Sequence, residues 1–256
     1  LIDECGGPTQ SIGATLVPIA TPDGKLTPEL IAPQLAHVGN VHHTQPKVIS
    51  ISQTTELGTI YQPEEIKAIA QFAHANDMYL HIDGARFSNA VATLGCSLKA
   101  ASADCGVDIM SFGGTKNGMM MGEAILIFNE QLRANAPYFH KQSAQLFSKN
   151  SFIAAQFKAL LTNNLWLRMA LNANKMAKLL ATQLSDIKEV KITQQVEANA
   201  LFVIIPPHIV EPLREQYRFY DWNGATGELR WMCSFDTTEE DVNNFVDQLR
   251  RLIIMQ

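Results

Sequence analysis

The sequence predicts an α/β protein in which a large domain with a mainly parallel sheet is followed by a smaller α+β domain. Between residues 47 and 127, short apolar runs alternate with helical patterns, as in parallel strands joined by crossover helices. A long helical stretch follows at residues 151–184, and short apolar runs and one amphipathic helix come after it. We expect the large domain at residues 1–158, and the connecting helices and the small domain at residues 159–256.

The elements of the large domain can be assigned one by one. The run "KVISIS" at residues 47–52 predicts a strand, and "PEEIKAIAQFAHAND" predicts a helix, because Pro63 suits a first helical turn and its apolar residues share one face. The same patterns predict a strand in "MYLHID", a helix in "GARFSNAVATLG" that ends at Gly95, and strands in "VDIMSF" and "EAILIFN".

The second part of the chain is predicted in the same way. Residues 151–184 carry apolar residues at helical spacing over a length that predicts one long helix or two consecutive ones. Short strands are expected in "NALFVIIPP", "FYDWN" and "ELRWMCSF". In the last stretch, "TTEEDVNNFVDQLRRLI", either Thr237 or Thr238 is expected to cap a terminal helix with acidic residues in its first turn.

Composition excludes several classes of function. The chain has 256 residues, 46% of them hydrophobic, and a net charge of −5, which offers no basic surface to nucleic acid. Four dispersed cysteines without a CxxC pair argue against a zinc site or a disulfide framework and favour a reducing cytoplasm. No apolar run approaches the length of about 20 residues that spans a membrane. A small molecule is therefore the expected partner.

Asp83 and Arg86 follow an apolar strand, at the edge where open α/β sheets bind ligands. A carboxylate at that place needs a partner, and a protonated pyridine nitrogen is one that keeps it ionised. A planar guanidinium holds a carboxylate or phenolate with two hydrogen bonds. The alternatives are a helix N-cap for Asp83 and a surface ion pair for Arg86.

Lys116 lies among glycines in "SFGGTKNG", after another apolar strand. Glycines there permit unusual backbone angles and the close approach of a bulky ring. A desolvated lysine amine near positive charge is a Schiff-base nucleophile. A phosphate loop is excluded because the GxxxxGK[ST] pattern is absent, which leaves a solvated loop lysine as the alternative.

Three histidines, His37, His42 and His43, cluster in "HVGNVHH" without the spacing of a zinc helix. We expect a loop here and no metal site. One of these imidazoles is a candidate base for a substrate hydroxyl, since histidine titrates near neutral pH.

Four stretches, in order, resemble the low-specificity threonine aldolase and aromatic amino acid β-eliminating lyase family: "PKVISISQTTELGTIYQPEEI", "HIDGARFSNAVATLG", "DIMSFGGTKNG" and "ELRWMCSFDTTEEDV". The resemblance covers nearly the whole chain. It implies a pyridoxal-phosphate-dependent enzyme of fold type I, the aspartate aminotransferase-like fold. It also implies roughly ninety further residues before Leu1, which carry the first part of the fold and the phosphate cradle, so we expect the reading frame to extend upstream.

The resemblance also assigns roles to individual residues. It implies that Lys116 forms the Schiff base with pyridoxal 5′-phosphate and that Asp83 pairs with the protonated ring nitrogen. Arg86 would lie near the cofactor hydroxyl and the substrate carboxylate, and Arg230 would clamp that carboxylate. His42, with His43 as an alternative, would serve the substrate hydroxyl.

Further cofactor contacts implied by the resemblance are Thr115 and Lys149. Asn150 and Ser151 stand where relatives place a basic residue near the phosphate, which leaves Lys149 as the candidate.

The implied reaction is the aldol cleavage of a β-hydroxy amino acid of the threonine or allo-threonine type to glycine and an aldehyde. One alternative is β-elimination from another amino acid, because a fold and a cofactor do not determine which bond breaks. The other is a non-catalytic relative that acts as a binding or assembly subunit. The resemblance further implies a homodimer or homotetramer.

Overall fold

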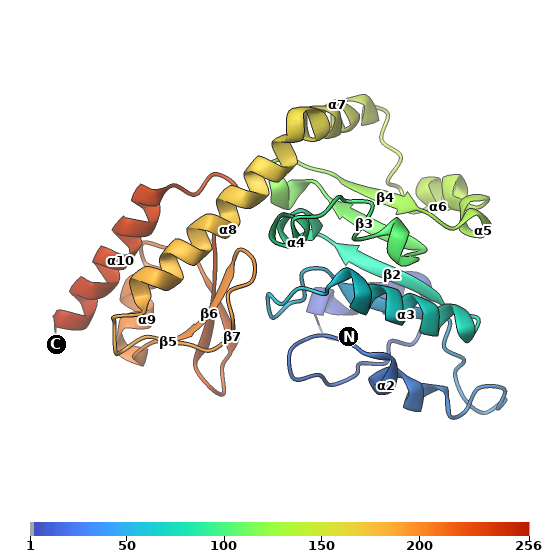
Figure 1. Cartoon of the computed structure of the whole chain (residues 1–256), viewed down its shortest axis with the longest axis horizontal. Helices are drawn as coiled ribbons and strands as arrows, with labels where there is room; N and C mark the ends of the chain where they lie inside the picture. Colours follow the sequence, from blue (N-terminus) through green and yellow to red (C-terminus); the bar gives the residue numbers. More distant parts are fainter. Residues whose placement is uncertain (1–2, 256) are drawn as a thin grey trace.

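The structure is a computed structural model that describes residues 3–255, and it contains two sheets with helices packed on them. In Figure 1 the first sheet and its helices lie on the right, and the second sheet with the C-terminal helix lies on the left. Each sheet has a hydrophobic cluster of its own. The long helix α8 (Leu165–Leu184) runs diagonally from one to the other.

The first sheet has four strands in the order β1-β2-β3-β4, with these bounds: β1 (Val48–Ser52), β2 (Tyr79–Gly84), β3 (Ile109–Gly113) and β4 (Glu123–Ile127). The predicted mainly parallel sheet is confirmed, since β1, β2 and β3 are parallel. The exception is β4, which is antiparallel to β3. A parallel partner needs a long crossover, whereas only residues 114–122 join β3 to β4.

The register of the parallel strands brings their carboxyl ends to one edge. Ser52 lies opposite Asp83, and Asp83 lies opposite Ser111. The loops that leave this edge therefore start side by side, which is the arrangement that places ligands in open α/β sheets.

Helices α3 (Pro63–Ala75) and α4 (Phe87–Leu94) follow β1 and β2, as predicted. Gly95 ends α4 with a left-handed φ of 65°, which glycine adopts without strain. Short helices that the sequence patterns did not predict are α1 (Gly7–Ile12), α2 (Pro28–Ile31), α5 (Glu130–Arg133) and α6 (Ala136–Gln142).

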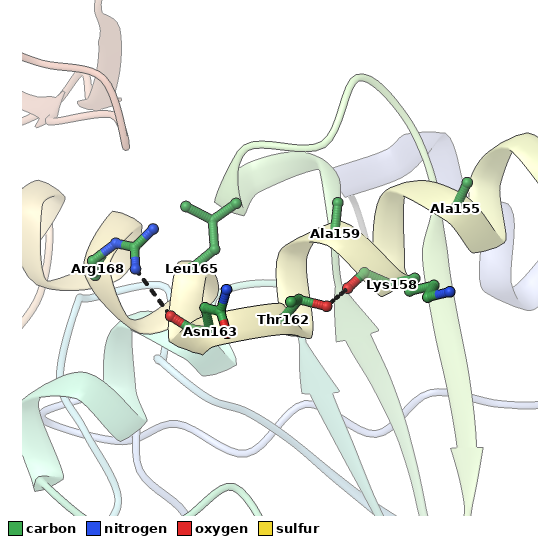
Figure 2. Close-up of a pocket in the computed structure, with 7 residues that line it drawn as sticks. All are labelled: Ala155, Lys158, Ala159, Thr162, Asn163, Leu165 and Arg168. Carbon is green, nitrogen blue, oxygen red and sulfur yellow. Dashed lines mark hydrogen bonds between the residues drawn. The ribbon is translucent and has the colours of Figure 1, made fainter.

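The predicted long helical stretch forms two consecutive helices, α7 (Asn150–Leu161) and α8. They are separated at Asn163 and Asn164, which have φ values of 53° and 54°. Figure 2 shows this break, where the Arg168 guanidinium donates to the Asn163 carbonyl oxygen (2.9 Å) beside an open pocket of about 420 Å³. The direction of α8 is thus set by two left-handed residues, a conformation that asparagine tolerates better than most residues.

The second sheet is antiparallel, in the order β5-β6-β8-β7, with these bounds: β5 (Lys191–Ile192), β6 (Ala200–Ile204), β7 (Tyr220–Asn223) and β8 (Glu228–Met232). Helices α9 (Pro207–Arg214) and α10 (Glu239–Ile254) complete this part. Thr238 caps α10, because its hydroxyl accepts a bond from the Asp241 amide (3.1 Å). The predicted strands and the predicted cap are confirmed.

The two hydrophobic clusters meet along α8: Trp166 belongs to the first and Met176 to the second. A buried amide pair fastens α8 to α4, in which Asn89 Nδ2 donates to Asn174 Oδ1 (3.0 Å). We retain the division at residues 158 and 159 as a proposal. Within residues 3–255, no helix has both the length and the apolar character needed to cross a membrane.

Candidate active site

Asp83 occupies the carboxyl end of β2 and is exposed there. Its Oδ1 atom accepts bonds from the Ala85 amide (3.0 Å) and from the Ser111 hydroxyl (3.4 Å). These two donors orient the carboxylate and leave Oδ2 for a ligand. Arg86, not Asp83, stands at the N-cap position of α4, so Asp83 does not serve as the helix cap.

Lys116 lies just beyond β3, in a tight turn at residues 115–117. The turn is fixed at its base, where the Glu123 carboxylate accepts bonds from the amides of Gly114 (2.9 Å) and Thr115 (3.2 Å). The Thr115 hydroxyl also accepts a bond from the Gly122 amide (3.0 Å). Lys116 itself is exposed, so the described residues do not desolvate its amine as a buried nucleophile would require. Its place beside Asp83, at the end of the neighbouring strand, follows from the sheet register.

The glycines around Lys116 let neighbouring backbone segments pack closely. A Cβ on Gly113 would lie 2.2 Å from the Ala85 carbonyl oxygen, and a Cβ on Gly114 would lie 2.4 Å from the Gly122 carbonyl oxygen. Both glycines therefore allow the chain's own backbone segments to approach. Only Gly118, with a φ of 104°, has the unusual backbone angle predicted for this turn.

Two arginines converge on one carboxylate: Arg86, at the start of α4, and Arg230, in β8 of the second sheet. Arg86 Nη1 lies 3.9 Å from Glu56 Oε1, and Arg230 Nη1 lies 3.2 Å from Glu56 Oε2. The side chains of Arg86 and Arg230 are only 15% and 12% exposed, whereas that of Glu56 is 58% exposed. Arg86 is therefore not the surface ion pair that was its alternative.

Burial and the neighbouring positive charge of Arg230 both lower the pKa of Arg86, against the opposing effect of Glu56 and Asp83. The Arg230 guanidinium lies over the ring of Trp222, 5.1 Å from its centroid, and close to the ring of Phe202. Cation–π contact of this kind holds a guanidinium in one plane. The two guanidiniums and the Glu56 carboxylate form a charged cluster, in which Arg86 and Arg230 are mostly buried.

The structure does not bring His42 to this edge. His42 precedes β1 and lies in an exposed loop, where its amide donates to Asn40 Oδ1 (3.0 Å), and His43 stacks on His37 at 4.0 Å. Because β1 and β2 are parallel, the residues before β1 lie at the amino edge of the sheet, and Asp83 lies at the carboxyl edge. In Figure 1 the loop after α2 lies on the side where β2 begins. Spacing along the chain could not reveal this separation.

Lys149 is exposed and stands immediately before α7. One turn later, Ile153 packs on the loop that follows Lys116, since a Cβ on Gly122 would lie 2.6 Å from Ile153 Cγ2. Lys149 is thus near the lysine turn in the fold, but no contact among residues 3–255 joins it to Asp83 or Lys116.

His81 is a further titratable group on the same strand as Asp83, two residues earlier. Its Nδ1 atom lies 2.8 Å from the Ser50 hydroxyl on β1. Burial lowers the pKa of His81, and the nearby Asp83 opposes that shift. Burial therefore disfavours the protonated form of the imidazole, and Nδ1 shares a hydrogen bond with the Ser50 hydroxyl.

Sequence patterns missed Glu56 and Glu123. Glu56 follows β1 as Asp83 follows β2, so the rule that singled out Asp83 also applies to it. Glu123 begins β4 and gave no signal, because its contacts depend on the turn between β3 and β4.

Comparison with known proteins identifies the family of this chain. The model of the family described as "Beta-eliminating lyase" matches residues 1–206. The chain belongs to the beta-eliminating lyase family. This confirms the resemblance and the predicted fold class, fold type I with a mainly parallel sheet and a smaller α+β part.

Individual members of the family are closely similar. The chain is 44% identical over 250 residues to a low specificity L-threonine aldolase of Pseudomonas aeruginosa, covering 97% of this chain and 72% of that protein. It is 42% identical over 253 residues to one from a Pseudomonas species, covering 98% and 73%. A solved structure of Leishmania major threonine aldolase superposes with a TM-score of 0.90 at 30% identity, covering 98% and 74% of the two chains.

Proposed function

We propose that this protein is a pyridoxal-phosphate-dependent lyase that cleaves a β-hydroxy amino acid of the threonine type to glycine and an aldehyde. The observation that carries the proposal is the 44% identity, over 97% of the chain, to a low specificity L-threonine aldolase. Its chemistry is supported by the convergence of Asp83, Lys116 and the arginine pair at one edge of the sheet.

The residues present fit this cofactor. Asp83 offers an oriented carboxylate with Oδ2 left for a protonated ring nitrogen. Lys116 offers an exposed amine from a turn that Glu123 and Thr115 hold in place. Lys149 remains the candidate for the phosphate.

When bound, pyridoxal phosphate supplies an electron sink for the electron pair of the breaking Cα–Cβ bond. The chain's residues would do the rest. Asp83 would hold the proton on the ring nitrogen, and Arg86 and Arg230 would bind the carboxylate and so orient the Cα–Cβ bond. The β-hydroxyl must lose its proton as the bond breaks, and Cα must gain one to form glycine. His42 remains our predicted base for the β-hydroxyl proton. The position of its loop does not support this role.

We also propose a homodimer or homotetramer in the cytoplasm. The family resemblance implies the assembly, and the four free cysteines favour a reducing compartment.

Product analysis tests the function. The protein is incubated with pyridoxal phosphate and L-threonine, and glycine, acetaldehyde, ammonia and keto acid are quantified. Equal amounts of glycine and acetaldehyde are expected. Ammonia with a keto acid would replace the proposal by β-elimination, and the absence of all four products would favour the non-catalytic alternative. A reaction without the cofactor is the control.

A further inference from the structure

The Glu56 carboxylate lies between the guanidiniums of Arg86 and Arg230. It lies in a turn after β1, in which the Thr55 amide donates to the Thr59 carbonyl oxygen (3.0 Å) and the Thr55 and Thr59 hydroxyls are 2.6 Å apart. Thr55 and Thr59 are buried. The Glu56 carboxylate is therefore presented to the guanidiniums by a braced loop, and its side chain is 58% exposed beside them.

The arginine pair keeps hydrogen-bond donors that Glu56 does not use. The contact from Arg86 at 3.9 Å is too long for a hydrogen bond, and no hydrogen bond from this guanidinium to another residue is found within residues 3–255. Arg230 donates to Glu56 Oε2 at 3.2 Å, but its Nε is buried without a partner among the described residues. Buried donors of this kind are normally satisfied, so these nitrogens are available to a further anionic group.

We propose that Glu56 is a specificity residue that restricts the ligands of this cluster to amino acids with a single carboxylate. The inference rests on the proposed function and deepens it. Arg86 and Arg230 contribute two positive charges and Glu56 one negative charge, which leaves one positive charge for the ligand, since the proposed function pairs the remaining carboxylate, Asp83, with the protonated ring nitrogen. A monocarboxylate neutralises that charge, whereas a second carboxylate meets the negative charge of Glu56 with no positive charge left to compensate it.

The physical reason is the low exposure of the guanidiniums. Charges that are mostly removed from water interact more strongly and are screened less by salt than surface charges. The guanidiniums are in this class, whereas Glu56 is 58% exposed and acts on a ligand that the buried guanidiniums hold beside it. Glu56 repels the single carboxylate of a monocarboxylate ligand and both carboxylates of a dicarboxylate ligand. Discrimination against the wrong ligand by a like charge is a common device for specificity. Acidic amino acids are thus the substrates that Glu56 excludes.

The experiment compares the binding of acetate and malonate to the wild-type chain and to Glu56→Gln by isothermal titration calorimetry. Removing the negative charge should tighten malonate binding at least about tenfold. Acetate binding should tighten by only about the square root of that factor, because one repulsion is relieved in place of two. Glu130→Gln, which removes the partner of Arg133 in an exposed ion pair elsewhere, should leave both affinities unchanged.

Three outcomes would overturn the inference: unchanged malonate binding, an equal gain for both anions, or no binding of either anion to wild type and variant. Glu56→Gln can fail to fold because the two guanidiniums then repel each other. In that case the effect of Glu56→Gln on malonate binding is measured in a chain that also carries Arg230→Gln. The double variant should bind malonate at least about tenfold more tightly than Arg230→Gln alone, and equal binding would also overturn the inference.

The test is separable from that of the proposed function. If threonine yields no glycine but Glu56→Gln tightens malonate binding as expected, the aldolase proposal fails and the role of Glu56 stands. If glycine forms and the malonate selectivity does not change, the aldolase proposal stands and the role of Glu56 fails.

Discussion

Arg230 belongs to β8 of the second sheet, yet its guanidinium contacts Glu56, which follows β1 of the first sheet. It is held by Glu56 at 3.2 Å and by the Trp222 ring at 5.1 Å. A side chain placed so firmly loses little conformational freedom when a ligand binds. The role that we propose for Arg230, from the family resemblance, is to bind the carboxylate of the amino acid.

Arg230→Ala should weaken amino-acid binding and spare the lysine that carries the cofactor. The loss of a charged bidentate contact costs roughly 2–3 kcal/mol, so kcat/KM for threonine should fall about 30- to 150-fold, chiefly through KM. Steady-state kinetics measure this, with Arg250→Ala as the control, because Arg250 pairs with Asp186 away from the site. A KM within twofold of wild type would contradict the assignment.

His81 predicts a pH dependence of stability. Burial lowers its pKa below the ordinary value of 6.5, so the unfolded chain binds a proton at His81 more readily than the folded chain. The stability that neutral His81 contributes is present above pH 6.5 and is lost as the pH falls through the lowered folded pKa.

Replacing His81 by Asn, which can still accept a bond from Ser50, should flatten that slope. The difference in unfolding free energy between wild type and His81→Asn is measured by urea denaturation at pH 7.5 and pH 5.5. At pH 5.5 the wild type should have lost more unfolding free energy, relative to pH 7.5, than the variant has. A difference that is the same at both values would refute the assignment.

Among the structural elements, β3 is closely packed at its last residue, Gly113, just before the turn to β4. A Cβ on Gly113 would lie 2.2 Å from the Ala85 carbonyl oxygen and less than 3 Å from two further backbone atoms of Ala85. Neither backbone segment can move away without disturbing the strand pairing that positions Asp83 and Lys116.

Gly113→Ala should therefore destabilise the protein by about 2–4 kcal/mol, at or above the usual range for overpacking, because the obstacle is backbone. Gly224→Ala is the matched control, since an added Cβ there meets no atom within 4 Å. Chemical denaturation of both variants measures the effect. Equal stabilities would show that the β2–β3 contact is looser than described.

The sequence predicted most elements, because their patterns are local. The strands β1, β2 and β3, the two consecutive helices α7 and α8, and the Thr238 cap all follow from apolar spacing and turn residues. The direction of β4 was not predicted, because it depends on the length of its connection, which periodicity does not weigh. Short helices such as α2 and α9 carry too few turns for a periodic signal.

For the candidate site, strand-end residues were predictable and loop residues were not. Asp83, Arg86 and Lys116 follow directly from strands whose carboxyl ends share an edge. Glu56 was missed because its partner Arg230 lies 174 residues away in the chain. His42 was placed by spacing alone, and the fold puts its loop at the opposite edge of the sheet.

On the scale of the whole molecule, the candidate site lies between the two hydrophobic clusters. Asp83 and Lys116 belong to the first sheet and its loops, and Arg230 belongs to the second sheet. The helix α8 and the buried Asn89 and Asn174 pair hold the two parts together. Binding of an amino acid by Arg86 and Arg230 at once therefore depends on how the two parts are joined.

The central claim is that Lys116 carries the cofactor, and borohydride reduction tests it most directly. The protein is loaded with pyridoxal phosphate, reduced and digested, and the phosphopyridoxyl group is located by peptide mapping. The label should lie on Lys116. Lys116→Arg should fold with near-native circular dichroism, take no label and lose almost all aldol cleavage, because arginine stays protonated near neutral pH. A label on Lys141 or Lys149, or on no lysine, would contradict the account.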